Sequence, residues 1–151
     1  MINSKKYILV KYFSIFYLIS VLNVVTFNLI SNYFKINSGF NNESQTVLEI
    51  FFTVVILAPL IETFLFNYTT QKFIEFFTSH KIKVILFSSI VFSIVHCYSF
   101  IYMVYSFFAG LILNLFYHYC KSNFNVTNAF WLTFLLHLAH NLTGFIILEL
   151  I

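Results

Sequence analysis

Apolar segments long enough to cross a lipid bilayer follow one another along almost the whole chain. They cover approximately residues 7–30, 47–68, 84–100, 101–119 and 126–148, with short polar breaks between them. A membrane-spanning helix needs about 20 mostly apolar residues, and no irregular backbone can face the hydrocarbon core. The sequence therefore predicts an all-α integral membrane protein in which about five transmembrane helices form one bundle.

The composition excludes other broad classes of protein. Of the 151 residues, 60% are hydrophobic and only 9% are charged, whereas about a quarter of the residues of a soluble domain are charged. So many spans leave no room for a soluble module, and we expect no nucleic-acid partner. The first apolar segment exceeds the ~7–15 residues of a signal-peptide core, so we expect it to be retained. We expect residues 1–46 to form an N-terminal transmembrane helix with its loop, and residues 47–151 the transmembrane core.

The lysines indicate the orientation of the chain in the membrane. If the N-terminus is cytoplasmic and the spans alternate, only Lys35 falls outside the cell. The lysines that fall inside are Lys5, Lys6, Lys11, Lys72, Lys81, Lys83 and Lys121. Because positive residues are enriched in cytoplasmic loops, we expect this topology in a multi-pass protein of the cell membrane. It puts Cys97 near the outer face and Cys120 near the inner face, so we expect no disulfide bond between them.

Glu62 lies deep inside the second apolar segment. A charged side chain at that depth is costly, and ionisable residues within a membrane generally mark functional sites. Pro59 precedes Glu62 by about one turn and has no backbone N–H, so in an α-helix it leaves the carbonyl of Val55 without a donor. We therefore expect a kinked or loosened helix next to the carboxylate.

Three other polar residues lie in the later apolar segments. His96 is in the third segment, and His137 and Asn141 are in the fifth. At about 1.5 Å of rise per residue, all three fall in the middle band of the membrane, as Glu62 does. Taken singly, a histidine or an asparagine in a membrane is more often a hydrogen-bonded contact between helices. Four such residues at one depth favour a shared site.

These side-chain types suit hydrolysis of an amide bond by activated water. A carboxylate such as Glu62, without a nearby Lys or Arg, can act as a general base toward water. Imidazoles can polarise that water or bind a metal ion, and an asparagine amide can donate to the oxyanion of a tetrahedral intermediate. A Zn²⁺ ion or another divalent metal would take Glu62, His96 and His137 as ligands. No HExxH motif is present, so a metal-free site remains an alternative.

The same residues belong to an ordered set of motifs. They read Ala58-Pro59-Leu60-Ile61-Glu62 with Phe66, then Phe92-Ser93-Ile94-Val95-His96, then Phe107-Phe108-Ala109-Gly110, and last His137-Leu138-Ala139-His140-Asn141. From about Thr53 to Phe145, this order resembles the CAAX-protease and bacteriocin-processing family (CPBP, or Abi) of intramembrane proteases. The resemblance implies a helical bundle in a bacterial cell membrane that cleaves a membrane-associated peptide or protein.

The resemblance also implies a role for each polar residue. Glu62 corresponds to the base that activates water, and His96 to its partner. His137 and Asn141 correspond to the groups that stabilise the oxyanion. Metal-dependent and metal-free descriptions of this family both exist, so the resemblance leaves the cofactor open.

The sequence departs from the family pattern at two positions. The family usually has Glu-Glu-x-x-x-Arg, where this chain has Glu62-Thr63-Phe64-Leu65-Phe66-Asn67. The second Glu and the Arg could form an ion pair on one helix face, and their joint loss leaves Thr63 and Asn67 as a neutral pair that can still hydrogen-bond. If the ion pair only braces the helix, catalysis survives its loss. If the second Glu holds water or metal, the chain is an inactive binding protein for bacteriocin immunity or regulation.

A weaker alternative is a small transporter that uses Glu62 and the histidines as a proton relay. His140 lies on the same broad helix face as His137 and could be an extra ligand, although a packing role is favoured. Gly110 is expected to allow close helix contact. Phe92, one turn before His96, is expected to hold that imidazole in place.

Overall fold

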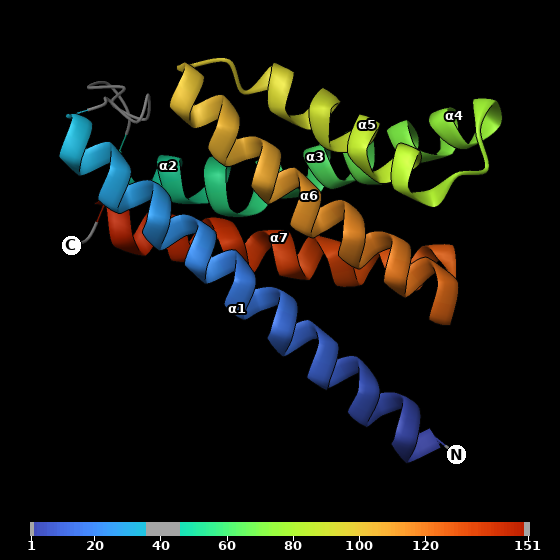
Figure 1. Cartoon of the computed structure of the whole chain (residues 1–151). Coiled ribbons are helices and arrows are strands. Elements are labelled where there is room, and N and C mark those ends of the chain that lie inside the picture. The colour runs from blue at the N-terminus through green and yellow to red at the C-terminus, as the bar shows by residue number, and fades with distance from the viewer. Residues whose placement is uncertain (1, 36–45, 150–151) are drawn as a thin grey trace.

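The computed structural model describes residues 2–35 and 46–149, and Figure 1 shows them as helices joined by short turns. The elements are α1 (Ile2–Phe34), α2 (Val47–Ile50), η1 (Phe51–Leu57), α3 (Ala58–Glu62), η2 (Thr63–Thr69), α4 (Thr70–Phe77), α5 (Lys81–Val95), α6 (Phe100–Asn123) and α7 (Val126–Glu149). No strand occurs in these two stretches. The elements from α2 to α4 follow without a break and form one helical rod, residues 47–77. The prediction of an all-α fold is confirmed.

Four helices in the described part of the chain are long and apolar enough to cross a membrane. They are Lys6–Phe34, Val47–Phe77, Phe100–Asn123 and Val126–Ile147. The remaining helix, α5, has 15 residues, which rise only about 22 Å against a hydrocarbon core of ~30 Å. The chain is therefore a multi-pass membrane protein whose predicted third span, at residues 84–100, is shorter than expected.

The ends of the helices differ slightly from the predicted ones. α1 continues through Phe34, so the predicted loop at residues 31–46 begins about one turn later. Residues 36–45 of that loop lie outside the described part of the chain. The turn predicted between the third and fourth spans is present, because Ser99 Oγ accepts a hydrogen bond from the amide of Tyr102 at 3.1 Å and caps α6.

The helical rod is not a regular α-helix. In η1 and η2 the backbone hydrogen bonds follow the π-helical pattern, in which an amide donates to the carbonyl five residues earlier. At the end of η1 the amide of Ala58 donates to Thr53 O. The next amide in this register would be that of Pro59, which has no hydrogen, and its acceptor would be Val54 O. The prediction named Val55 instead because it assumed α-helical spacing.

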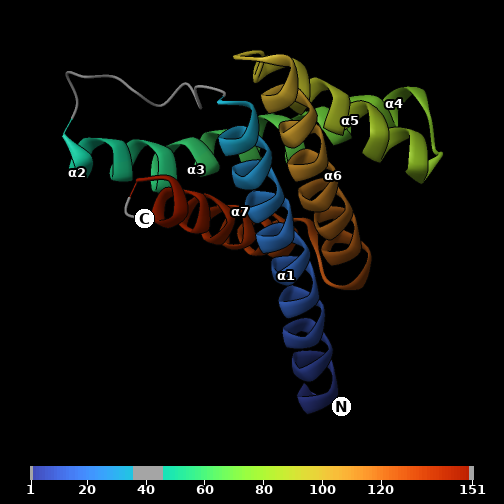
Figure 2. The same cartoon turned by 60° about the vertical axis from the view of Figure 1, so that its left-hand side comes forward.

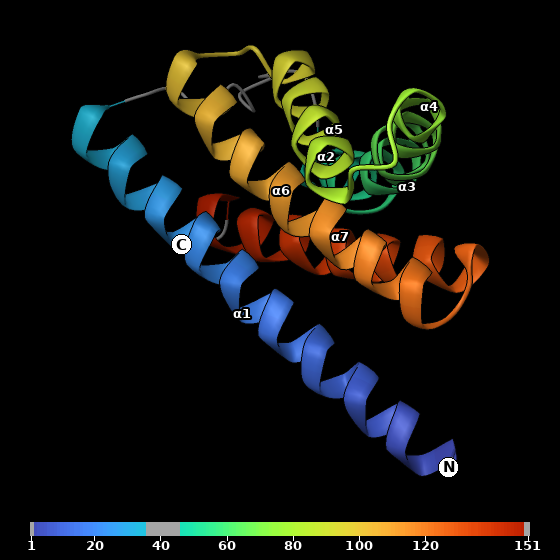
Figure 3. The ribbon, with the colours of Figure 1, turned by 45° about the vertical axis from the view of Figure 1, so that its right-hand side comes forward.

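α6 and α7 form the centre of the bundle. Figure 3 shows α1 on one side of these two helices and the rod with α5 on the other. The N-terminal end of α1 extends beyond the other helices (Figures 1 and 2). Fully buried apolar side chains, including those of Phe116, Ala129 and Leu136, fill the centre. Large apolar side chains such as Leu22 and Leu115 face outward, as expected for helices that contact lipid.

The two cysteines allow the predicted topology to be tested. Both thiols are free, and Cys97 is exposed whereas Cys120 is buried. We expect a membrane-impermeant maleimide to label Cys97 from the outside of intact cells and to leave Cys120 unlabelled. Labelling should disappear in Cys97→Ser and persist in Cys120→Ser. Recovery of a Cys97–Cys120 disulfide from intact membranes would contradict the topology, because these residues would then lie at the same face.

Candidate active site

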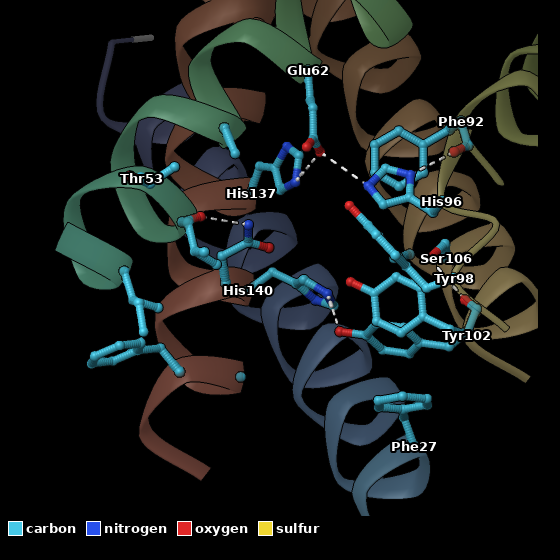
Figure 4. Close-up of a pocket in the computed structure, with 18 residues that line it drawn as sticks. Phe27, Thr53, Glu62, Phe92, His96, Tyr98, Tyr102, Ser106, His137 and His140 are labelled. Carbon is cyan, nitrogen blue, oxygen red and sulfur yellow. Dashed lines mark hydrogen bonds and ion pairs between the residues drawn. The ribbon is translucent and has the colours of Figure 1, made fainter. Parts of the chain in front are cut away.

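The carboxylate of Glu62 lies between two imidazoles that come from other helices. Glu62 is the last residue of α3, His96 immediately follows the end of α5, and His137 lies in the middle of α7. Glu62 Oε2 is 3.6 Å from His96 Nε2 and 3.5 Å from His137 Nε2, and Figure 4 shows both rings turned toward the carboxylate. The structure thus brings together the three residues that the sequence nominates as base, partner and oxyanion donor.

The orientation of His96 is fixed by the backbone. His96 Nδ1 lies 2.7 Å from Phe92 O, and a carbonyl oxygen can only accept, so Nδ1 carries the proton and donates. In the neutral ring Nε2 is then an acceptor, and it faces another acceptor, Glu62 Oε2. Two acceptors can remain at this distance if they share a proton or if a water molecule donates to both.

Thr63, one of the two residues that depart from the family pattern, contacts the ring of His137. Thr63 Oγ1 is 3.2 Å from His137 Nδ1, and the two side chains are 0% and 2% exposed. If the Thr63 hydroxyl donates to Nδ1, then Nε2 of His137 carries the proton and can donate. The two histidines can therefore face the carboxylate in opposite roles, one as acceptor and one as donor.

The packing of His96 depends on a glycine of α6. The Phe92 ring stacks on the His96 ring with centroids 4.5 Å apart. A Cβ atom at Gly110 would lie 3.0–3.1 Å from the Phe92 side chain, which is too close for an ordinary contact. Gly110 thus allows the helix contact expected from the sequence, and Phe92 rests against both this surface and the imidazole.

Asn141 shares the cavity but its amide does not point to the carboxylate. Its Nδ2 donates to Val54 O at 2.8 Å, the carbonyl whose partner in the π-helical register would be Pro59. Asn141 therefore connects α7 to the helical rod, and the oxyanion role implied for it by the family resemblance stays a prediction.

A cavity of about 250 Å³ lies beside these residues. Figure 4 shows Glu62, His96 and His137 at one end and Phe27, Tyr102 and His140 toward the other. Its volume is just below the ~300–1,000 Å³ of typical ligand pockets, so it suits a few side chains of a substrate rather than a folded segment.

Sequence reasoning missed part of this cavity. Tyr102, Ser106 and Ala109 all line it from α6, and their spacing of three and four residues puts them on one helix face. That spacing, read together with Gly110, is the signal that could have identified them. Phe27 of α1 also lines the cavity, and no sequence motif marks it.

His140 acts in packing rather than as an extra ligand. Its Nδ1 lies 2.6 Å from Ser20 Oγ and its Nε2 lies 2.8 Å from the hydroxyl of Tyr105. Since both ring nitrogens already have protein partners, His140 joins α1, α6 and α7 at the wall of the cavity.

The second departure from the family pattern belongs to a buried polar network. Asn67 Nδ2 donates to Asn114 Oδ1 at 2.9 Å, and Gln71 Nε2 donates to the same oxygen at 2.8 Å. Asn114 Nδ2 donates in turn to Ser89 Oγ at 3.3 Å. These four side chains are 0% exposed. Asn67 therefore bonds to α6 and Thr63 to α7, and they do not form the mutual pair suggested by the sequence.

The donor types around Glu62 are those of a catalytic zinc site, which combines imidazole nitrogens with a carboxylate. In residues 2–35 and 46–149, however, no three His, Cys, Asp or Glu side chains are arranged so that they could hold a metal ion. In the arrangement described here, Glu62, His96 and His137 do not form a metal site. The metal-bound form of the site stays a prediction.

A protein-family model matches about two thirds of the chain. Residues 44–143, which are 100 of the 151 residues, match the family described as type II CAAX prenyl endopeptidase Rce1-like. The matched region begins just before the helical rod and ends within α7, so it includes all four motif positions and leaves out α1. No curated protein and no solved structure matches the chain.

The contact between Gly110 and Phe92 allows a matched pair of substitutions. Gly110→Ala and Gly144→Ala both replace a helical glycine by a better helix former, which alone stabilises by about 1 kcal/mol. Nothing lies within 4 Å of a Cβ at Gly144, whereas the clash at Gly110 should cost about 1–3 kcal/mol. We expect Gly110→Ala to lower the melting temperature of the purified protein in detergent and Gly144→Ala to raise it or leave it unchanged. Equal melting temperatures would contradict the packing described for Phe92.

Proposed function

Because the chain belongs to the Rce1-like family of type II CAAX prenyl endopeptidases, we propose that it hydrolyses a peptide bond in a membrane-associated peptide or protein. The observation that carries this proposal is the approach of Glu62 Oε2 to Nε2 of both His96 and His137, at 3.6 and 3.5 Å. These gaps exceed the ~2.7–3.2 Å of a direct hydrogen bond. A water molecule bound among the three atoms would satisfy all of them.

In the proposed reaction, Glu62 accepts a proton from this water while the water oxygen attacks the carbonyl carbon of the scissile peptide bond. The second O–H of the water stays intact and donates a hydrogen bond to His96 Nε2, which orients the water oxygen for attack. His137 donates from Nε2 to the developing oxyanion, with the Thr63 hydroxyl donating to its Nδ1. The proton held by Glu62 then passes to the leaving nitrogen, and the products are a carboxylic acid and an amine.

A metal-dependent version of the proposal uses the same three side chains. Glu62, His96 and His137 would be the ligands, and a divalent ion such as Zn²⁺ would supply an activated water molecule. The metal content of the purified protein, compared with that of His137→Ala, distinguishes the two versions.

A second candidate function is binding without catalysis, in immunity to a bacteriocin or in regulation of a partner. It is favoured by one observation, the neutral residues Thr63 and Asn67 where the family usually has an acid and a base. A binding protein would keep its phenotype without the carboxylate of Glu62, whereas a protease would lose it.

Substitution of Glu62 tests the protease directly. We expect Glu62→Gln to lower cleavage by about 10²–10⁴-fold, the usual contribution of a general base. The probe is a prenylated peptide with a CAAX-type end, together with a mixture of membrane peptides whose new termini are read by mass spectrometry.

The control for this experiment removes a carboxylate from the same rod far from the site. Glu75 pairs with Lys121, with oxygen–nitrogen distances of 2.6 and 2.7 Å, and Glu75→Gln should retain cleavage. Full activity or full immunity in Glu62→Gln, at an unchanged level of protein in the membrane, would favour the binding protein.

The hydroxyl of Thr63 gives a second test. Thr63→Val keeps the shape of the side chain but removes the hydrogen bond to His137, which is worth about 0.5–1.5 kcal/mol. We expect kcat to fall by about 3- to 10-fold, and Thr63→Ser to retain activity because it keeps the hydroxyl. If Thr63→Val and Thr63→Ser cleave equally well, Thr63 has no part in orienting His137.

A further inference from the structure

The helical rod contains a carbonyl that has lost its expected backbone donor close to the site. In η1 the last π-helical bond joins the amide of Ala58 to Thr53 O. The next bond in this register would join residue 59 to Val54 O, but residue 59 is proline and has no N–H. A carbonyl inside a membrane protein needs a donor from elsewhere in the molecule.

That donor comes from α7. Asn141 Nδ2 lies 2.8 Å from Val54 O, which is the length of a good hydrogen bond. Asn141 follows His137 by one helical turn, and Pro59 precedes Glu62 by three residues. The bond therefore joins the two helices whose side chains meet at the carboxylate.

We propose that Asn141 is a positioning residue: it supplies the hydrogen bond that Pro59 cannot, and so holds α7 against the rod with His137 facing Glu62. This positioning role is an alternative to the oxyanion role that the family resemblance implies for Asn141. The activity measurements below rest on the proposed protease function, whereas the structural measurements do not.

Pro59 makes this proposal testable by rescue. An alanine at position 59 has an amide hydrogen that can donate to Val54 O, so the carbonyl no longer depends on Asn141. Asn141→Leu removes the side-chain donor at a similar volume. The experiment compares the unchanged protein with Asn141→Leu, with Pro59→Ala, and with the double variant.

Two measurements do not require activity. We expect Asn141→Leu to lower the melting temperature in detergent, and to do so much less when Pro59→Ala is present. The imidazole ¹⁵N signals of His137, assigned by their loss in His137→Gln, should move in Asn141→Leu and return in the double variant. If neither quantity recovers, the hydrogen bond to Val54 O is not what Asn141 contributes, and the proposal is wrong.

Activity then separates positioning from chemistry. A displacement of about 1 Å can cost on the order of 100-fold in rate, so kcat should fall by about that factor in Asn141→Leu, with KM little changed. Pro59→Ala should restore kcat to within a fewfold if Asn141 acts through position. If melting temperature and ¹⁵N signals recover but kcat does not, Asn141 acts on the oxyanion itself and the positioning role is overturned.

The same measurements distinguish a chain that is not a protease from a chain in which Asn141 does not have the proposed role. If the unchanged protein cleaves no probe, the rescue of melting temperature and of the His137 signals still supports the bond and the alignment that it maintains. Their failure to recover contradicts the proposal whether or not the protein is a protease.

Discussion

The arrangement of the bundle depends on keeping one carboxylate inside a membrane protein without a lysine beside it. Among the described residues, two groups that can carry a positive charge lie within 4 Å of the Glu62 carboxylate. They are the imidazoles of His96 and His137. Each ring is held in turn by a neutral group, the carbonyl of Phe92 or the hydroxyl of Thr63. Because an uncompensated buried charge is far more costly than a neutral polar group, the carboxylate, the two imidazoles and the groups that hold them act as one unit. The rod, α5 and α7 must therefore keep a fixed register.

The alternation of helix types in the rod explains how polar residues reach the interior from one helix. Thr63, Asn67 and Gln71 recur every four residues, and all are fully buried. A spacing of four residues is slightly more than one turn of an α-helix, which has 3.6 residues per turn, so the stripe rotates gradually around an α-helix in one direction. The same spacing is less than one turn of the wider π-helix, so there the stripe rotates in the opposite direction. The change from π-helix to α-helix at Thr70 therefore keeps the stripe facing the bundle. π-Helical stretches are frequent at functional sites, and here they flank the segment that carries Glu62.

The sequence was sufficient to predict the helical membrane fold, which follows from hydropathy, and to select Glu62, His96 and His137, of which both imidazoles approach the carboxylate within 4 Å in the structure. It could not predict which carbonyl Pro59 leaves without a donor, since that depends on a π-helical register that no residue type marks. The sequence also did not predict which residues of the other helices Thr63 and Asn67 contact. Those contacts depend on how the rod rotates against α6 and α7, which is set by packing over the whole bundle.

The two departures from the family pattern have different consequences in this structure. Asn67 belongs to a network with Asn114 and Gln71, and its Oδ1 has no partner among the described atoms, so its role is to join helices. Thr63 instead contacts His137 directly, and a hydroxyl there can donate to Nδ1 and leave Nε2 as the donor toward the cavity. A carboxylate at this position could only accept from Nδ1, which would assign Nε2 the opposite role in the neutral ring. In the proposed reaction, a Thr rather than a Glu at position 63 therefore determines that His137 is the partner of Glu62 that donates to the oxyanion, in addition to removing a charge.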